Sequence, residues 1–191
     1  MGILLAFAPF AVFALLDRII GPVEALAAGA AAAAVLIVRD LASAGRRVKV
    51  LEAGTFVLFA GLALYTLLSG AARSVIGVRL CVDAGLLLIV LASMAMGRPF
   101  TLQYARERVS PDVRDRPEFI RVNHVITGAW ALAFGVMVLA ELALLTVPDM
   151  PRRAGVTAII LALVGAVKFT GWYPEHRRQV GASSLPRTTN A

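Results

Sequence analysis

The chain has 191 residues, of which 59% are hydrophobic and 16% are charged, and its mean hydropathy is +0.80. These values exclude an ordinary soluble domain and are typical of an integral membrane protein. The net charge of +7 does not indicate nucleic-acid binding, because the cations lie between apolar runs rather than on a polar domain with interleaved aromatic residues. A single cysteine, Cys81, excludes an internal disulfide and a multi-cysteine metal site.

Six apolar runs follow one another along the chain. The first, residues 2–16, reaches only about 22 Å as a helix, so we expect a short or tilted span, or a re-entrant or interfacial helix. The others are residues 19–38, 53 to 68 or 72, 75–96, 122–147 and 154–173. None alternates polar and apolar residues with period two. The sequence therefore predicts an all-α fold, a polytopic integral membrane helix bundle with five or six transmembrane helices.

Polar stretches divide this chain into a membrane domain and a tail. Residues 1–175 are predicted to form the transmembrane domain, with a polar loop over residues 97–121 that separates four runs from two. Trp172 and Tyr173 stand where membrane-interface anchors are expected. The polar composition of residues 176–191 predicts a disordered tail.

Lysine and arginine residues indicate the orientation. If successive connections alternate sides, fourteen of the nineteen fall on the side of loop 97–121 and of the tail. The other five are Arg18, Arg73, Arg79, Arg152 and Arg153. The positive-inside bias then places the loop and the C-terminus in the cytoplasm.

Ionisable residues inside apolar runs are costly and suggest a functional site. Arg79 and Asp83 are four residues apart, so they share a helix face and are predicted to form an ion pair. Asp83 lies about 12 Å and Glu141 about 9 Å from the outer ends of their runs, and Glu24 lies at a similar level. We therefore predict a polar cluster of Arg79, Asp83, Glu141 and Glu24 in the outer leaflet.

Two interpretations of this cluster stay open. In the functional one, Asp83 or Glu141 takes up and releases a proton while Arg79 holds an anionic group. In the structural one, Arg79 only neutralises Asp83, Glu24 is interfacial, and Glu141 bonds a neighbour. Lys168 is close enough to the cytoplasmic end of its run to act as an anchor.

Other polar residues give weaker indications of chemistry. His124 and His176 lie near helix ends without a clustered carboxylate or cysteine, so no metal and no cofactor is predicted. Asp112, Asp115 and Glu118 have a spacing that suits magnesium-diphosphate binding, but the prolines and arginines around them favour a mixed-charge loop. The apolar residues of 100–109 do not form one stripe, which leaves a surface-lying amphipathic helix as an open alternative.

Several short motifs together resemble a known family. They are residues 7–10 (Phe-Ala-Pro-Phe), residues 97–100 (Gly-Arg-Pro-Phe) at the end of the fourth run, and residues 121–123 (Arg-Val-Asn) at the start of the fifth. With the basic loop after the second run, this layout resembles the bacterial intracellular septation protein A family, or a distant branch of that superfamily, over residues 3–175. Pro9, Arg98, Pro99 and Asn123 match its pattern.

The resemblance implies a multi-pass protein of the bacterial plasma (inner) membrane with a role in envelope maintenance or cell division. Its expected partners are the bilayer, other envelope or division proteins and further copies of itself, without catalysis. The four matching residues are expected to be structural: two prolines at helix ends, an arginine at the headgroups and an asparagine between helices. The alternatives are a small proton-coupled transporter or lipid-handling protein that uses Arg79, Asp83 and Glu141, and an enzyme acting on a lipid diphosphate.

Overall fold

A computed structural model describes residues 5–43, 48–69 and 75–183, and the regular structure of this part of the chain is entirely α-helical. The helices are α2 (Ala8–Leu16), α3 (Pro22–Ala42), α4 (Val50–Ser69), α5 (Val75–Ala95), α6 (Phe100–Arg106), α7 (Pro111–Arg114), α8 (Pro117–Thr146) and α9 (Arg152–Ser183). Five of them, α3, α4, α5, α8 and α9, are long and apolar enough to cross a membrane. The predicted all-α class is confirmed, with five candidate spans by length and composition.

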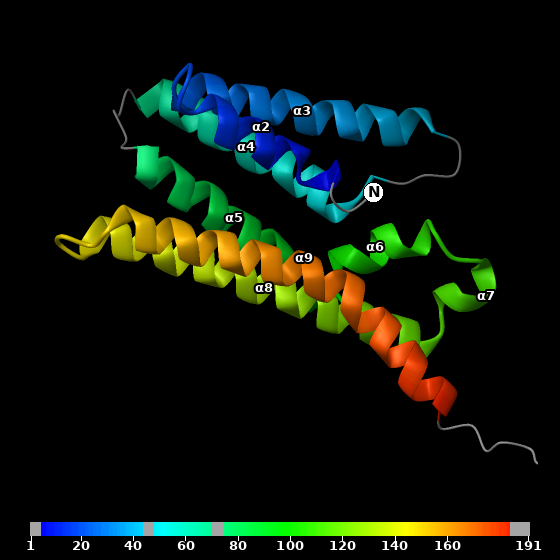
Figure 1. Ribbon diagram of the computed structural model, residues 1–191. Helices are drawn as coiled ribbons and strands as arrows, with labels where there is room; N and C mark the ends of the chain where they lie inside the picture. Colours follow the sequence, from blue (N-terminus) through cyan, green and yellow to red (C-terminus); the bar gives the residue numbers. More distant parts are fainter. Residues whose placement is uncertain (1–4, 44–47, 70–74, 184–191) are drawn as a thin grey trace, which may run out of the picture.

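Figure 1 shows two antiparallel helix pairs, α3 with α4 and α8 with α9, and α5 between them in contact with both α4 and α8. The bundle therefore has two ends. We call one the Arg79 end, where α3, α5 and α9 begin, and the other the Lys49 end, where α4 and α8 begin and where α6 and α7 lie.

Helix α2, from the first apolar run, has only nine residues and packs along α3. Phe7, before its start, stacks on Trp130 with ring centroids 4.7 Å apart, and Asp17, at its C-terminal cap, reaches Arg79. Its direction is therefore from the Lys49 end toward the Arg79 end, antiparallel to α3. Its length falls short of the 17 residues or so that a span requires.

Small residues let α3 and α4 approach closely. A Cβ atom added at Gly29 would lie 3.0 Å from the ring of Phe59, which is fully buried. Phe59 in turn contacts Phe10 and Phe13 of α2, with ring centroids 5.1 and 5.6 Å apart. In a membrane, where the solvent is itself apolar, this kind of close packing is a main source of helix association.

Two helices extend further than the sequence predicted. Helix α8 begins at Pro117, inside the predicted loop, because proline is well suited to a first helical turn. Helix α9 continues through Pro174 to Ser183, where disorder was predicted from residue 176. Stacking of Trp172 on His176, at 4.8 Å, supports the helix across the proline. Residues 184–191 lie outside the described part of the chain.

Candidate functional site

Arg79 lies in the second turn of α5. Its guanidinium donates two hydrogen bonds to Asp17, from Nε to Oδ2 at 2.7 Å and from Nη2 to Oδ1 at 2.8 Å. The Asp17 side chain is fully covered, whereas that of Arg79 is 26% exposed. The ion pair predicted between Arg79 and Asp83 is thus replaced by a pair with Asp17. An aspartate from another helix presents both oxygens to the planar guanidinium, which gives the stronger bidentate geometry.

Asp83 of α5 and Glu141 of α8 lie close enough for their carboxyl groups to interact with each other and with the charge of Arg79. Glu141 is 5% exposed, and its Oε2 has no N–H or O–H partner among the described residues. Arg79, Asp83 and Glu141 are therefore brought together, and with Asp17 they form what we call the Arg79 cluster.

Glu24, the fourth residue predicted for this cluster, has a different position. It is exposed in the first turn of α3, and its Oε2 lies 2.9 Å from the point that a Cβ atom would occupy at Gly21. The carboxylate therefore folds back over the N-terminus of its own helix, where the helix dipole favours a negative charge. The carboxylates whose charge acts on Arg79 are those of Asp17, Glu141 and Asp83.

A second group of charges surrounds Lys49, just before α4. This side chain is 4% exposed and its ammonium is hydrogen-bonded to Asp40 of α3. It also lies 2.9 Å from Oε1 of Glu107 and 3.7 Å from Oε1 of Glu52, and 5.0 Å from the centre of the Tyr104 ring. Burial alone would lower the pKa of Lys49, but the hydrogen bonds to Asp40 and Glu107 and the charge of Glu52 raise it.

Tyr104 and Arg39 complete the group. The Tyr104 hydroxyl donates to Oε1 of Glu52 at 3.1 Å, and Arg39 Nη2 lies 3.0 Å from Asp40 Oδ1. Burial, aided by the charge of Glu52, raises the pKa of Tyr104, so its hydroxyl remains a donor. Asp40 and Glu52 are 0% and 1% exposed. We call these residues the Lys49 cluster: Arg39, Asp40, Lys49, Glu52, Tyr104 and Glu107.

Helix α6 connects this cluster to the rest of the bundle. Gln103 accepts a hydrogen bond from Val50 N through Oε1, at 2.9 Å, and donates through Nε2 to Arg98 O, at 3.0 Å. Thr101 donates to Asn123 O of α8 at 2.9 Å and shares a 2.7 Å hydrogen bond with Thr127. The open alternative of a surface-lying amphipathic helix is wrong, because polar as well as apolar side chains of α6 are buried.

The three motifs of the resemblance meet at this end of the bundle. Phe7 and Phe100 pack edge to face, with centroids 6.1 Å apart, and Val122 packs against the same aromatic core. We call this contact among residues 7–10, 97–100 and 121–123 the motif junction. Its aromatic core also includes Trp130 and Phe134.

The four residues expected to be structural have definite places. Pro9 is buried in the first turn of α2, and Pro99 caps the N-terminus of α6. The side chain of Asn123 donates to Phe119 O of its own helix at 2.8 Å, so the bond between helices is made by its backbone carbonyl instead. Arg98 is exposed just beyond α5.

The remaining polar candidates are dispersed. Asp115 pairs with Arg106 at 3.0 Å on the surface, and Asp112 lies in the exposed helix α7. His124 Nδ1 lies 3.1 Å from Ile120 O of its own helix. Within the described ranges, no three His, Cys, Asp or Glu side chains lie close enough to hold a metal ion.

The sequence interpretation missed Asp17 and the Lys49 cluster. Asp17 directly follows the first apolar run, and Lys49 belongs to the basic loop after the second run, which are positions where charged residues are ordinarily solvated. A signal for the cluster was present in the spacing of Lys49 and Glu52, three residues apart at the start of an apolar run.

Comparison of the chain with protein-family models, with curated proteins and with solved structures finds no match.

Proposed function

We propose that this protein is a multi-pass protein of the bacterial plasma (inner) membrane, of the septation protein A type, which acts as a scaffold in envelope maintenance or cell division. The motif junction carries the proposal. Three short motifs, separated by up to about 110 residues of sequence, pack on one another in space. The three motifs therefore occur together because they form one contact in the fold, and this supports the resemblance.

The Lys49 end is the end that we propose to face the cytoplasm and to contact partners. It contains most of the basic residues, as the positive-inside bias requires for a cytoplasmic end. Helix α7 extends away from the bundle here, and none of its residues is buried (Figure 1). Its charged side chains are available to another protein, whereas those of the Lys49 cluster are used internally.

A rescue experiment tests this role. The gene is deleted in the source bacterium, cell length and envelope integrity are scored, and alleles are compared at matched membrane levels. We expect Arg114→Glu with Arg116→Glu to fail in rescue and Asp83→Asn to succeed, because only the first pair changes the exposed surface. Rescue by the Arg114/Arg116 double variant and failure of a folded Asp83→Asn protein would contradict the scaffold role.

One observation favours a second candidate, a small proton-coupled transporter or lipid-handling protein. The carboxyl groups of Asp83 and Glu141 lie beside each other in a part of α5 and α8 that is otherwise apolar, and Glu141 is buried. Arg79 is engaged by Asp17, so among the described residues this pair of carboxyl groups lacks a cation of its own and could serve as a site for a proton. Failure of Asp83→Asn in the rescue assay, with the protein folded, would favour this candidate.

A further inference from the structure

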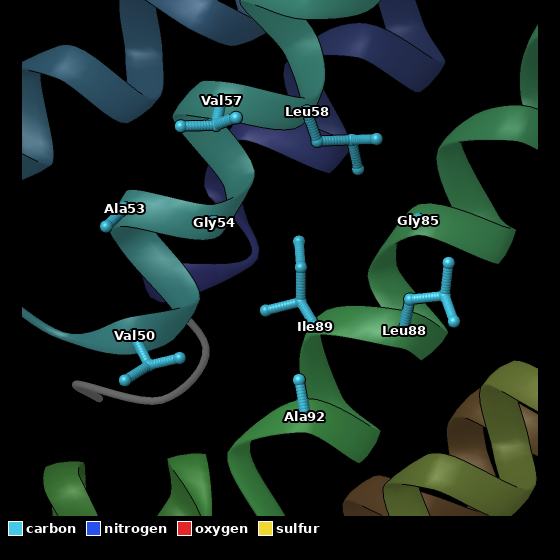
Figure 2. Close-up of a pocket in the computed structure, with 9 residues that line it drawn as sticks. All are labelled: Val50, Ala53, Gly54, Val57, Leu58, Gly85, Leu88, Ile89 and Ala92. Carbon is cyan, nitrogen blue, oxygen red and sulfur yellow. The ribbon is translucent and has the colours of Figure 1, made fainter. Parts of the chain in front are cut away.

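An apolar groove runs between α4 and α5 on the outside of the bundle. Figure 2 shows Leu58 and Ile89 directed into the space between the two helices. The groove is open along its outer side and has a volume of about 540 Å³. Its lining contains no polar side chain: Val50, Ala53, Gly54, Val57, Leu58, Gly85, Leu88, Ile89 and Ala92.

The length of the groove matches one leaflet rather than a whole membrane. It extends from Val50 to Leu58 on α4 and from Ala92 to Gly85 on α5. At about 1.5 Å per residue these segments are about 10–12 Å long, against about 15 Å for half of the hydrocarbon thickness. A transmembrane helix of a partner would contact a longer stretch. One acyl chain, entering from the Lys49 end, fits this length.

Arg98 is fixed at the mouth of the groove. Helix α5 ends at Ala95, and the turn that follows contains Gly97, whose φ is +67°. In this turn Arg98 N donates to Ser93 O at 2.9 Å, directly after the lining residue Ala92. Arg98 O accepts from Gln103, which also bonds the N–H of Val50, the lining residue at the start of α4. The backbone of Arg98 is thereby tied to both helices of the groove.

The side chain of Arg98 is available for a ligand. It is exposed, and the described carboxylates offer it no salt bridge. A guanidinium binds phosphate in a bidentate manner and favours a headgroup with a net negative charge. We propose that the α4–α5 groove binds one acyl chain of an anionic phospholipid, with the lipid phosphate on Arg98. This site depends neither on the scaffold role nor on the orientation of the protein.

Native mass spectrometry of the purified full chain tests the site. Phosphatidylglycerol and phosphatidylcholine with the same acyl chains are added to delipidated protein. The wild type should prefer phosphatidylglycerol, and Arg98→Gln should lower that preference about fivefold. Arg121→Gln removes an equal charge from an exposed position on α8 and should leave the preference unchanged. Equal losses in both variants, or none in Arg98→Gln, would overturn the proposal.

The acyl chain is tested separately. Ala92→Phe fills the groove from an exposed position, and Leu91→Phe places the same ring at an exposed position of α5 outside the lining. Only Ala92→Phe should lose bound lipid.

Should Ala92→Phe fail to fold, a second experiment uses Leu88→Trp, which places a fluorophore on the groove wall. Brominated phosphatidylglycerol should then quench it more than brominated phosphatidylcholine, and Arg98→Gln should abolish the difference. Equal quenching by the two lipids in the presence of Arg98 would overturn the proposal.

Discussion

The two charge clusters neutralise their buried charges in different ways. In the Arg79 cluster, one arginine is paired with one aspartate, and two further carboxyl groups lie beside each other. In the Lys49 cluster, one buried ammonium is shared among Asp40, Glu52 and Glu107. The first cluster contains two carboxyl groups that take no part in its ion pair. In the second, Lys49 contacts all three carboxylates, and Arg39 adds a second cation beside Asp40 and Glu52.

The largest expected effect therefore comes from removing Lys49. Lys49→Ala leaves Asp40 and Glu52 buried without their main counterion, which should lower the free energy of unfolding by about 3–5 kcal/mol. Denaturant titration in detergent micelles measures the change. Lys168→Ala is the matched control, since this other lysine is exposed on α9 and should matter by no more than about 0.5 kcal/mol. Similar values for the two variants would show that Lys49 has no such role.

In the Arg79 cluster, the two aspartates are expected to differ. Asp17→Asn removes the bidentate partner and should cost about 3 kcal/mol, at the lower end for a buried pair because Arg79 is partly exposed. Asp83→Asn keeps that pair and an amide can still bond Glu141, so the cost should stay below about 1 kcal/mol. Thermal unfolding of both variants in one detergent gives the comparison. A larger loss of stability in Asp83→Asn than in Asp17→Asn would indicate that Asp83 is the main counterion of Arg79.

Tyr104→Phe removes a single hydrogen bond from the Lys49 cluster. Because Glu52 then loses its hydroxyl donor while remaining buried, we expect a loss of about 2 kcal/mol. Tyr173→Phe, at a half-buried position of α9, is the control. Equal stability of Tyr104→Phe and the wild type would mean that water or another donor replaces the hydroxyl.

The raised pKa of Lys49 predicts how stability depends on pH. A lysine whose pKa rises on folding stabilises the folded state below its unfolded value, near 10.4, and this contribution is lost as the pH passes the folded value. Unfolding measured from pH 7 to 11 should show a loss only at the alkaline end. The loss should be smaller in Lys49→Arg, whose guanidinium stays charged. A loss that begins near pH 8 would indicate a lowered pKa.

The smallest effect is expected on the surface of the Lys49 end. Arg106 and Asp115 form a 3.0 Å pair, but their side chains are 41% and 86% exposed. Asp115→Ala should change the unfolding free energy by no more than about 0.5 kcal/mol. A loss comparable to that of Tyr104→Phe would show that α7 is held more firmly than its exposure indicates.

The two clusters also show what the sequence could and could not predict. Three charged residues interrupt apolar runs: Arg79, Asp83 and Glu141. An ionisable side chain inside a membrane has a high free-energy cost, so these residues could be recognised as a candidate site from the sequence. Lys49 and Asp40 stand at the ends of runs, where charged residues are ordinarily solvated. Their burial depends on α6, which turns back under the bundle after Gly97 and covers them with Tyr104. This burial results from packing between segments that are distant in the sequence, so no local sequence pattern predicts it.

The proposed scaffold role requires the Lys49 end to face the cytoplasm, and cysteine accessibility tests this directly. In a Cys81→Ala background, Arg114→Cys places a thiol on α7 and Arg152→Cys places one at the Arg79 end, where both parent residues are exposed. Spheroplasts are treated with a membrane-impermeant maleimide before and after permeabilisation. We predict modification of Arg152→Cys in intact spheroplasts and of Arg114→Cys only after permeabilisation. The opposite pattern would contradict the orientation and, with it, the placement of the scaffold surface.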